Sequence, residues 1–204
     1  MADGLAVSPM FLEEAEARAA AQALAGGELV VAEARAEEIE EPAPLPYTTA
    51  ELLADAAERW TWPAVKVMAV AQRLFEGVTL NGAHTGLITY PRTDSAQTAA
   101  EARAEARALI AQLYGPAALP AAGVAGWLNV FRRSSGAGAA PAVKSQEAHE
   151  AIRPTATRRK PDDLRAVLDE DELALYRLIW ERFVASQMRP ARYRLTTVEL
   201  ESSD

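Results

Sequence analysis

Cysteine is absent from the sequence, which excludes disulfide bonds and cysteine-based metal sites and leaves the redox compartment open. Long apolar runs are absent as well, since none approaches the ~20 residues that a helix needs to cross a bilayer. The N-terminus has no basic stretch followed by an apolar one, so no secretion signal is predicted. The expectation is a cytoplasmic protein with no membrane span.

Basic residues are in deficit. The 204 residues include 21 Lys and Arg against 29 Asp and Glu, which gives a formal net charge of −8. This sign opposes binding to DNA through the overall field of the protein. Any contact with DNA is therefore expected to come from local basic groups, unless a more basic part of the protein lies elsewhere.

The composition that remains is typical of a globular protein with one or two domains, with 50% hydrophobic and 25% charged residues. Hydrophobic periodicity and capping signals, among them Thr48 with Glu51 and Thr98 with Glu101, locate the elements. Helices are predicted over about 8–25, 48–59, 63–75, 98–115 and 169–188, and strands over about 28–37 and 191–200.

Proline and glycine mark the connections between these elements. Pro42, Pro44 and Pro46 predict a stiff extended linker and a domain boundary. Residues 116–145 are rich in Gly, Ala, Pro and Ser and are predicted to form a long surface loop. The helices over 48–59 and 63–75 are compatible with a helix-turn-helix, although such a pair is more often part of a helical core.

The most informative stretch is GLITYPRTDS at residues 86–95. A predicted strand leads to Tyr90 and ends there, because Pro91 cannot donate a backbone hydrogen bond. A phenol is a poor nucleophile at neutral pH without help, and Arg92 can supply that help when the target is a phosphate. The alternative is a half-buried aromatic residue at a strand end, with Arg92 and Asp94 forming an ordinary ion pair.

A second stretch, EAHEAIRPT at residues 147–155, contains His149 beside Glu150 and Arg153. An imidazole can donate a hydrogen bond to a phosphate oxygen or move a proton near neutral pH. Taken alone, a histidine beside a glutamate is more often structural, and no spacing typical of metal ligands is present. His84 has no comparable surroundings and is predicted to be a loop residue.

These two stretches resemble signatures of the type IA DNA topoisomerases, and they occur in the order found in that family. The resemblance extends to PLPYTTAEL at 44–52, VAQRLFEG at 70–77 and LYRLIWERFVASQM at 175–188. It is nearest to bacterial topoisomerase I, although proline after the tyrosine looks like topoisomerase III and reverse gyrase. Thr48, Thr49 and Gln72 lie in these segments, but helix capping and packing account for them.

The resemblance implies that Tyr90 attacks a phosphodiester of single-stranded DNA and becomes linked to the 5′ phosphate. Arg92 and His149 complete the implied catalytic set, and Asp94 is expected to position Arg92. Strand passage and religation would then relax negatively supercoiled DNA without a nucleoside triphosphate, in the nucleoid. The implied DNA-binding residues are Arg92, Thr93, Asp94, Ser95 and Arg153.

The family also requires Mg²⁺, held by acidic residues on a domain that precedes this region. No converging acidic cluster is found in this sequence, so this chain is expected to bind no metal. It is expected to be an internal fragment that depends on the missing N-terminal metal-binding domain and is inactive alone.

The expected fold class is mainly α, a helical tyrosine-bearing domain flanked by β-containing pieces of a gate domain, and α+β overall. The implied boundaries are residues 1–47 for an N-terminal piece of the gate domain, 48–189 for the helical domain, and 190–204 for a returning strand.

Two other functions are compatible with some of these features. A non-catalytic DNA-binding or gate module would use Tyr90 only to stack on a base. A tyrosine recombinase would join the 3′ phosphate, but it needs Arg and His residues upstream of its tyrosine. Here the segment that contains His149 and Arg153 lies downstream, which disfavours a recombinase.

Overall fold

The structure is a computed structural model, and it describes residues 13–26, 29–120 and 150–202. The chain divides into two compact units, one comprising residues 1–39 and 192–204 and the other residues 40–191. No helix in the described ranges is long and apolar enough to cross a membrane.

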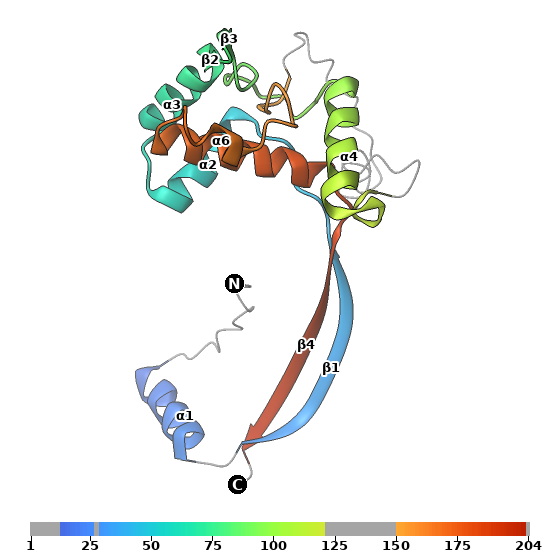
Figure 1. The fold of residues 1–204 in the computed structure, drawn as a ribbon. Coiled ribbons are helices and arrows are strands. Elements are labelled where there is room, and N and C mark those ends of the chain that lie inside the picture. The colour runs from blue at the N-terminus through green and yellow to red at the C-terminus, as the bar shows by residue number, and fades with distance from the viewer. Residues whose placement is uncertain (1–12, 27–28, 121–149, 203–204) are drawn as a thin grey trace, which may run out of the picture. The chain divides into compact units, whose positions relative to one another are not determined.

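The first unit contains helix α1 (Glu14–Gly26) and a two-stranded sheet of β1 (Leu29–Glu41) and β4 (Ala191–Ser202) (Figure 1). An ion pair of 2.7 Å joins Arg35 on β1 to Glu199 on β4. Side chains along both strands are exposed, and they include large apolar residues such as Val31 and Tyr193. This two-stranded sheet therefore buries little apolar surface.

The second unit is built mainly from helices. Its α-helices are α2 (Thr49–Trp60), α3 (Ala64–Glu76), α4 (Ala100–Tyr114) and α6 (Glu170–Ser186), with short 3₁₀ helices η1 (Pro116–Ala118) and η2 (Pro161–Leu164). Helix α6 packs on α3 and α4, and α2 packs on α3. The core that these helices share includes Leu52, Leu74, Ile110, Tyr176 and Ile179.

The prediction of a mainly helical chain is wrong, because the described fold is α+β with two small sheets. Strands β1 and β4 have 13 and 12 residues and extend beyond the predicted strands. A second sheet pairs β2 (Val78–Leu80) with β3 (Ala83–Thr85) in antiparallel register. The turn between them contains Asn81 and Gly82, both with positive φ, which is the residue pair that tight hairpin turns favour.

No regular strand ends at Tyr90, which differs from the sequence-based prediction. Residues 86–90 lie outside regular secondary structure, and their strand-like pairing is an isolated antiparallel bridge between Ile88 and Pro154. The regular strand ends earlier, at Thr85, which is the last residue of β3.

The capping predictions have different outcomes. The box of Thr48 and Glu51 at the start of α2 is confirmed, since each side chain bonds the other's backbone N–H. The prediction of a capping box formed by Thr98 and Glu101 is wrong. Ala99 is the N-cap residue of α4, and its side chain makes no capping hydrogen bond. The carboxylate of Glu150, far along the chain, instead accepts a hydrogen bond from the Ala99 N–H.

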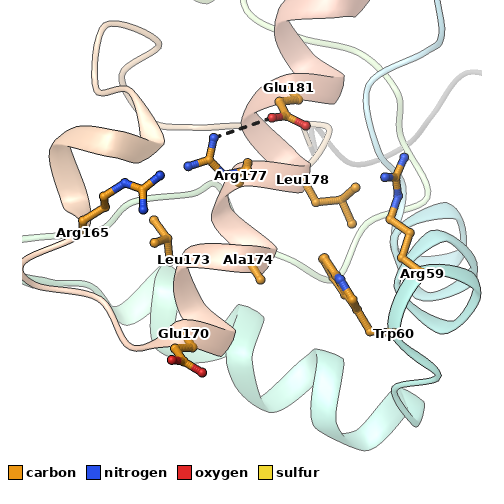
Figure 2. A pocket seen from close by; sticks show the side chains of 9 residues that line it. All are labelled: Arg59, Trp60, Arg165, Glu170, Leu173, Ala174, Arg177, Leu178 and Glu181. Atoms are coloured by element: carbon orange, nitrogen blue, oxygen red, sulfur yellow. Dashed lines mark ion pairs between the residues drawn. The ribbon is translucent and has the colours of Figure 1, made fainter.

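A pocket of about 440 Å³ lies between the end of α2 and one face of α6 (Figure 2). Its lining side chains are Arg59, Trp60, Arg165, Glu170, Leu173, Ala174, Arg177, Leu178 and Glu181. Arg165 and Arg177 are each 2.8 Å from Asp162, so both guanidinium groups already share an acidic partner. No described residue of GLITYPRTDS or EAHEAIRPT lines this pocket, and it is separate from the candidate site described next.

Candidate active site

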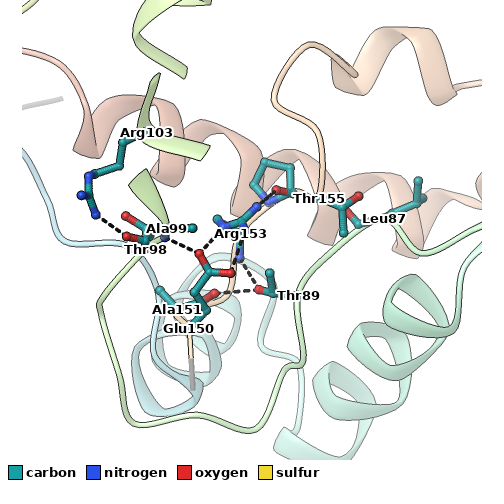
Figure 3. A network of polar contacts seen from close by, with 10 residues as sticks. Leu87, Thr89, Thr98, Ala99, Arg103, Glu150, Ala151, Arg153 and Thr155 are labelled. Atoms are coloured by element: carbon teal, nitrogen blue, oxygen red, sulfur yellow. Dashed lines mark hydrogen bonds and ion pairs between the residues drawn. The ribbon is translucent and has the colours of Figure 1, made fainter. Parts of the chain in front are cut away.

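The two motif segments lie side by side, joined by backbone hydrogen bonds (Figure 3). The Thr89 N–H donates to the Arg153 carbonyl at 2.9 Å, and the Arg153 N–H donates to the Thr89 hydroxyl at 3.0 Å. The Thr155 N–H donates to the Leu87 carbonyl at 2.9 Å. Leu87 is buried in the core, so packing in the core fixes the position of this pairing. Two segments more than 60 residues apart thus form one platform.

A third segment completes this platform. The Ile152 N–H donates to the Tyr47 carbonyl at 2.8 Å, and the two residues form an antiparallel bridge. Tyr47 comes from PLPYTTAEL, so three of the five stretches noted in the sequence meet here. Leu74, from a fourth stretch, accepts a hydrogen bond of 2.8 Å from the Leu87 N–H.

Tyr90 lies at the end of this platform and 43% of it is exposed. Its ring meets that of Phe75 edge to face, with the centroids 5.4 Å apart and the planes at 69°. A contact of this kind fixes the direction of a ring while its rim stays accessible. Tyr90 therefore presents a partly held phenol at the surface.

Two other tyrosines of this unit are unsuited to act as nucleophiles. Tyr47 is 1% exposed and donates its hydroxyl proton to Asp55, and both burial and that bond raise its pKa. Tyr176 is fully buried and donates to the Arg159 carbonyl at 2.7 Å, and burial raises its pKa as well. A phenol that is harder to deprotonate and shielded from ligands is a poor nucleophile.

Thr49 holds the backbone that follows Tyr90. The Thr49 N–H donates to the Thr93 carbonyl at 2.9 Å, and the Thr93 N–H donates to the Thr49 hydroxyl at 2.8 Å. That hydroxyl also lies 2.8 Å from the Pro91 carbonyl, to which it can donate. Capping accounts for Thr48, but Thr49 has this additional role, which the sequence analysis missed. The available signal was the doubled threonine, because one suffices for a cap.

Replacing Thr49 with valine is expected to loosen residues 91–93. The change keeps the side-chain shape and removes the hydroxyl, leaving the Thr93 N–H without its acceptor at a cost of about 1 to 2 kcal/mol. Amide hydrogen exchange should therefore become about tenfold faster at Thr93. Thr49→Ser retains the hydroxyl and should keep the native exchange rate. Unchanged exchange in the valine variant would contradict this role.

The residues after Tyr90 divide into exposed and buried ones. Arg92 and Asp94 have exposed side chains, and no ion pair joins them, so Asp94 does not hold Arg92 as the sequence analysis expected. Thr93 is only 8% exposed, and its hydroxyl accepts a hydrogen bond of 3.0 Å from the Ser95 N–H. The Ser95 hydroxyl accepts one of 3.2 Å from the Gln97 N–H. Thr93 and Ser95 thus shape the loop that presents Arg92.

The Arg153 side chain forms its hydrogen bonds within the protein. Its guanidinium binds the Glu150 carboxylate through two hydrogen bonds, at 3.0 Å and 2.7 Å, and a third at 2.9 Å reaches the Pro154 carbonyl (Figure 3). Only 12% of the side chain is exposed. A bidentate pair of this kind fixes geometry strongly. Arg153 is therefore placed as a brace of the platform, and its predicted contact with DNA stays a prediction.

Glu150 joins this brace to helix α4 by accepting from both Arg153 and the Ala99 N–H. Arg103, in the first turn of α4, donates to the Thr98 carbonyl beside it. The preceding residue, His149, lies outside the described residues, so its predicted place beside Tyr90 stays a prediction.

The Glu150 carboxyl makes the stability of this unit depend on pH. Burial would raise its pKa, but the hydrogen bonds from Arg153 and the Ala99 N–H outweigh burial and hold the pKa below its usual range. A depressed carboxyl pKa contributes stability above the unfolded-state value, about 4.3, and this is lost as pH falls through the folded-state value.

Glu150→Gln should therefore unfold about 2 kcal/mol more easily at pH 7, because it weakens a partly buried ion pair. The difference from the native chain should shrink as the pH falls below about 4. Urea unfolding followed by circular dichroism at several pH values measures both effects. Glu58→Gln removes an exposed carboxylate from α2 and should show neither. A deficit that stays constant down to pH 2 would contradict the linkage.

A cleft of about 610 Å³ opens beside Arg92. It is lined by Thr49, Ala64, Val65, Met68, Ala69, Gln72 and Arg92. The cleft therefore shares Arg92 and Thr49 with the loop that follows Tyr90.

Metal binding finds no support among the described residues, which contain no group of three or more His, Asp or Glu that could hold an ion. The acidic start of α6 is neutralised by cations, since Lys66 lies 2.8 Å from Asp171 and Arg73 lies 2.7 Å from Glu172. These carboxylates are paired with cations and do not fit a magnesium site.

Comparisons with known proteins show what this chain is similar to. A family model described as DNA topoisomerase matches residues 6–204. Among solved structures, the chain is similar to full-length topoisomerase I from Thermotoga maritima, with 32% sequence identity and a TM-score of 0.72. That match covers 97% of this chain and 29% of the Thermotoga chain, so this chain spans less than a third of that protein's length.

Proposed function

The chain belongs to the type IA DNA topoisomerase family, and from this membership we propose that it supplies the nucleophile that opens one strand of DNA. The Tyr90 hydroxyl oxygen attacks the phosphorus of a phosphodiester. A tyrosine–phosphate bond to the 5′ phosphate forms as the bond to the 3′ oxygen breaks. The phenol loses its proton, and the leaving oxygen gains one to become a 3′ hydroxyl. One ester replaces another, so religation needs no nucleoside triphosphate.

One observation carries this proposal, namely the hydrogen-bonded pairing of residues 86–89 with 151–155 beneath an exposed Tyr90. The pairing brings the two motif segments together and leaves the phenol accessible at their edge. A purely structural tyrosine at this position would gain from burial, as Tyr47 and Tyr176 do. The exposure of Tyr90 makes it accessible to a ligand, and its place at the paired motif segments distinguishes it from other exposed tyrosines such as Tyr114.

Arg92 is assigned to the phosphate. Its side chain is exposed, and in the described part of the chain it makes no ion pair. A guanidinium can bind two phosphate oxygens at once and stabilise the charge that develops on them. His149 is proposed to bind a nonbridging oxygen of the same phosphate. Thr93 and Ser95 hold the loop, and Asp94 and Arg153 remain proposed contacts of the DNA.

The wider activity is proposed for an enzyme that combines this chain with a part that binds Mg²⁺ through acidic residues. Such an enzyme would act on single-stranded regions of negatively supercoiled DNA, in the nucleoid. The 204-residue chain alone is expected not to relax supercoils, since its described residues fit no metal site. Gel electrophoresis of negatively supercoiled plasmid after incubation with the chain tests this expectation, and robust relaxation would refute it.

The decisive experiment traps the covalent intermediate and maps it. The chain, supplied with the metal-binding part and Mg²⁺, is incubated with a single-stranded oligonucleotide, denatured and digested with nuclease and trypsin. Tryptic cleavage after Arg73 and Arg92 releases residues 74–92, in which Tyr90 is the one tyrosine. Mass spectrometry should find a nucleotide phosphate on that peptide. An oligonucleotide labelled at its 3′ end should stay with the protein, and one labelled at its 5′ end should be released.

Three results would overturn the proposal. Modification of another peptide would move the nucleophile away from Tyr90. Retention of the 5′ label would mean attachment through the 3′ phosphate, which is the chemistry of tyrosine recombinases. Absence of any adduct would favour a module that binds DNA without cutting it.

A further inference from the structure

The cleft beside Arg92 follows one face of helix α3. Val65, Met68, Ala69 and Gln72 line it at the three- and four-residue spacing of a single helical face. The opposite face of α3 carries the buried residues Val67, Val70, Ala71 and Leu74. The lining residues are therefore on the outer side of a helix whose inner side is fixed in the core.

The chemistry of this cleft is unusual for a helix surface. Val65 is 83% exposed although it is apolar, and Met68 and Ala69 add further apolar area beside it. A cation, Arg92, lies in the same lining, and the Gln72 amide lies one turn along from Met68. An apolar wall with one cation and one amide suits a ligand that has a flat apolar face, a negative charge and a polar edge. A nucleotide has all three features.

The cleft lies beside the candidate active site, with which it shares Arg92 and Thr49. Phe75, one turn beyond Gln72 on α3, packs against the ring of Tyr90. Arg92 follows Tyr90 by two residues and lines the cleft. Thr49 lines it too, while its hydroxyl holds the backbone of residues 91–93. The cleft therefore lies next to the loop that follows the phenol and shares Arg92 and Thr49 with it.

We propose that this cleft binds the nucleoside whose 5′ phosphate becomes attached to Tyr90. The inference rests on the proposed function, because attachment confines that nucleoside to the neighbourhood of the phenol. Arg92 binds its phosphate, while Val65 and Met68 contact the base. The Gln72 side chain gives one N–H to Glu76 at 2.9 Å, which leaves the other N–H and the carbonyl oxygen for the base edge. The cleft volume of about 610 Å³ is in the range of sites for small ligands.

Methionine methyl groups give a direct probe of this site in the whole chain. The sequence has four methionines, and Met68 lies in the cleft whereas Met188 lies beside the core. The chain is labelled with ¹³C at the methionine methyl groups and titrated with a 5′-phosphorylated deoxydinucleotide. The Met68 signal is expected to shift saturably while the Met188 signal stays in place. The same dinucleotide without its 5′ phosphate should bind about tenfold more weakly.

Substitutions in the exposed lining test the same site without disturbing the core. Val65→Glu places a carboxylate in the cleft and should weaken binding about tenfold or more. Arg92→Ala should weaken binding of the phosphorylated dinucleotide to the level of the unphosphorylated one. Ala57→Glu makes the same change of charge on an exposed position of α2 outside the cleft and should leave the affinity unchanged.

The outcomes separate this inference from the proposed function. A silent Met68 signal together with a nucleotide adduct on Tyr90 would overturn the inference and leave the function standing. An equal Met68 shift with inorganic phosphate alone would reduce the cleft to an anion site and also overturn it. A saturable Met68 shift with no adduct on Tyr90 would instead remove the proposed function and, with it, the assignment of this nucleoside.

Discussion

Replacing Tyr90 with phenylalanine is expected to abolish the covalent DNA–protein adduct. The substitution removes the single oxygen that forms the bond to phosphorus and keeps the ring that meets Phe75 at 5.4 Å. Because the ring contact is kept, and one hydroxyl contributes at most about 1.5 kcal/mol, the free energy of unfolding should change by no more than that amount. The adduct is measured as labelled DNA that stays with the protein on a denaturing gel, with the metal-binding part present.

Tyr114→Phe is the matched control for this loss. Tyr114 ends helix α4 and is 55% exposed, so it resembles Tyr90 in accessibility but lies in neither motif segment. The control should form adduct at the native rate. Adduct that persists in Tyr90→Phe, or disappears equally in Tyr114→Phe, would show that the assignment of the nucleophile is wrong.

Gly77→Ala is expected to give the largest loss of stability of any single methyl addition in the described chain. Gly77 has φ of 99°, a conformation that side chains rarely adopt, and a Cβ there would lie 2.2 Å from the Thr85 carbonyl oxygen. The three nearest atoms, the Thr85 carbonyl oxygen and carbon and the Gly86 nitrogen, all belong to the backbone, so none can move aside cheaply. Strain and overlap together should lower the free energy of unfolding by about 3 kcal/mol or more, as urea unfolding would measure.

The loss should also reach the candidate site. Gly77 follows α3, whose Leu74 carbonyl accepts the hydrogen bond of the Leu87 N–H. If the chain near Thr85 is pushed away, the segment that ends at Tyr90 loses its register against α3. Adduct formation should therefore fall in this variant even under conditions where most of the chain remains folded.

Gly82→Ala separates conformational strain from overlap. Gly82 also has a positive φ, 82°, but a Cβ there would meet no atom within 4 Å. Its cost should be about 1 kcal/mol, the strain alone. Equal losses in the two variants would contradict the argument that the close approach to Thr85 dominates.

Local signals in the sequence predicted several elements well. The box of Thr48 and Glu51 started α2, and the helix predicted over 169–188 is α6, with Asp169 and Glu172 forming its own box. Each signal acts over three or four residues, so the sequence contains all the information needed. The cap of α4 differs, because its acceptor is Glu150, 51 residues beyond Ala99. No local pattern specifies such a partner.

The candidate site shows the same division. The order Tyr90, Pro91, Arg92 and the resemblance it supports identified the segment. The structure added what holds it, which is Thr49 on one side and residues 151–155 on the other. The pairing that turns Arg153 inward onto Glu150 depends on tertiary contacts. The resemblance therefore implied a contact of Arg153 with DNA, although each of its three guanidinium nitrogens donates a hydrogen bond within the protein.

Three structural roles fall on the single helix α3. Leu74 accepts the hydrogen bond that fixes the segment leading to Tyr90, and Phe75 orients the phenol. The outer face between Val65 and Gln72 lines the proposed nucleoside cleft. Any tilt of this helix would carry all three in concert. Under the proposed function, a DNA end attached to Tyr90 would move together with this helix as the gap in the DNA strand widens. It would return in the same orientation for religation.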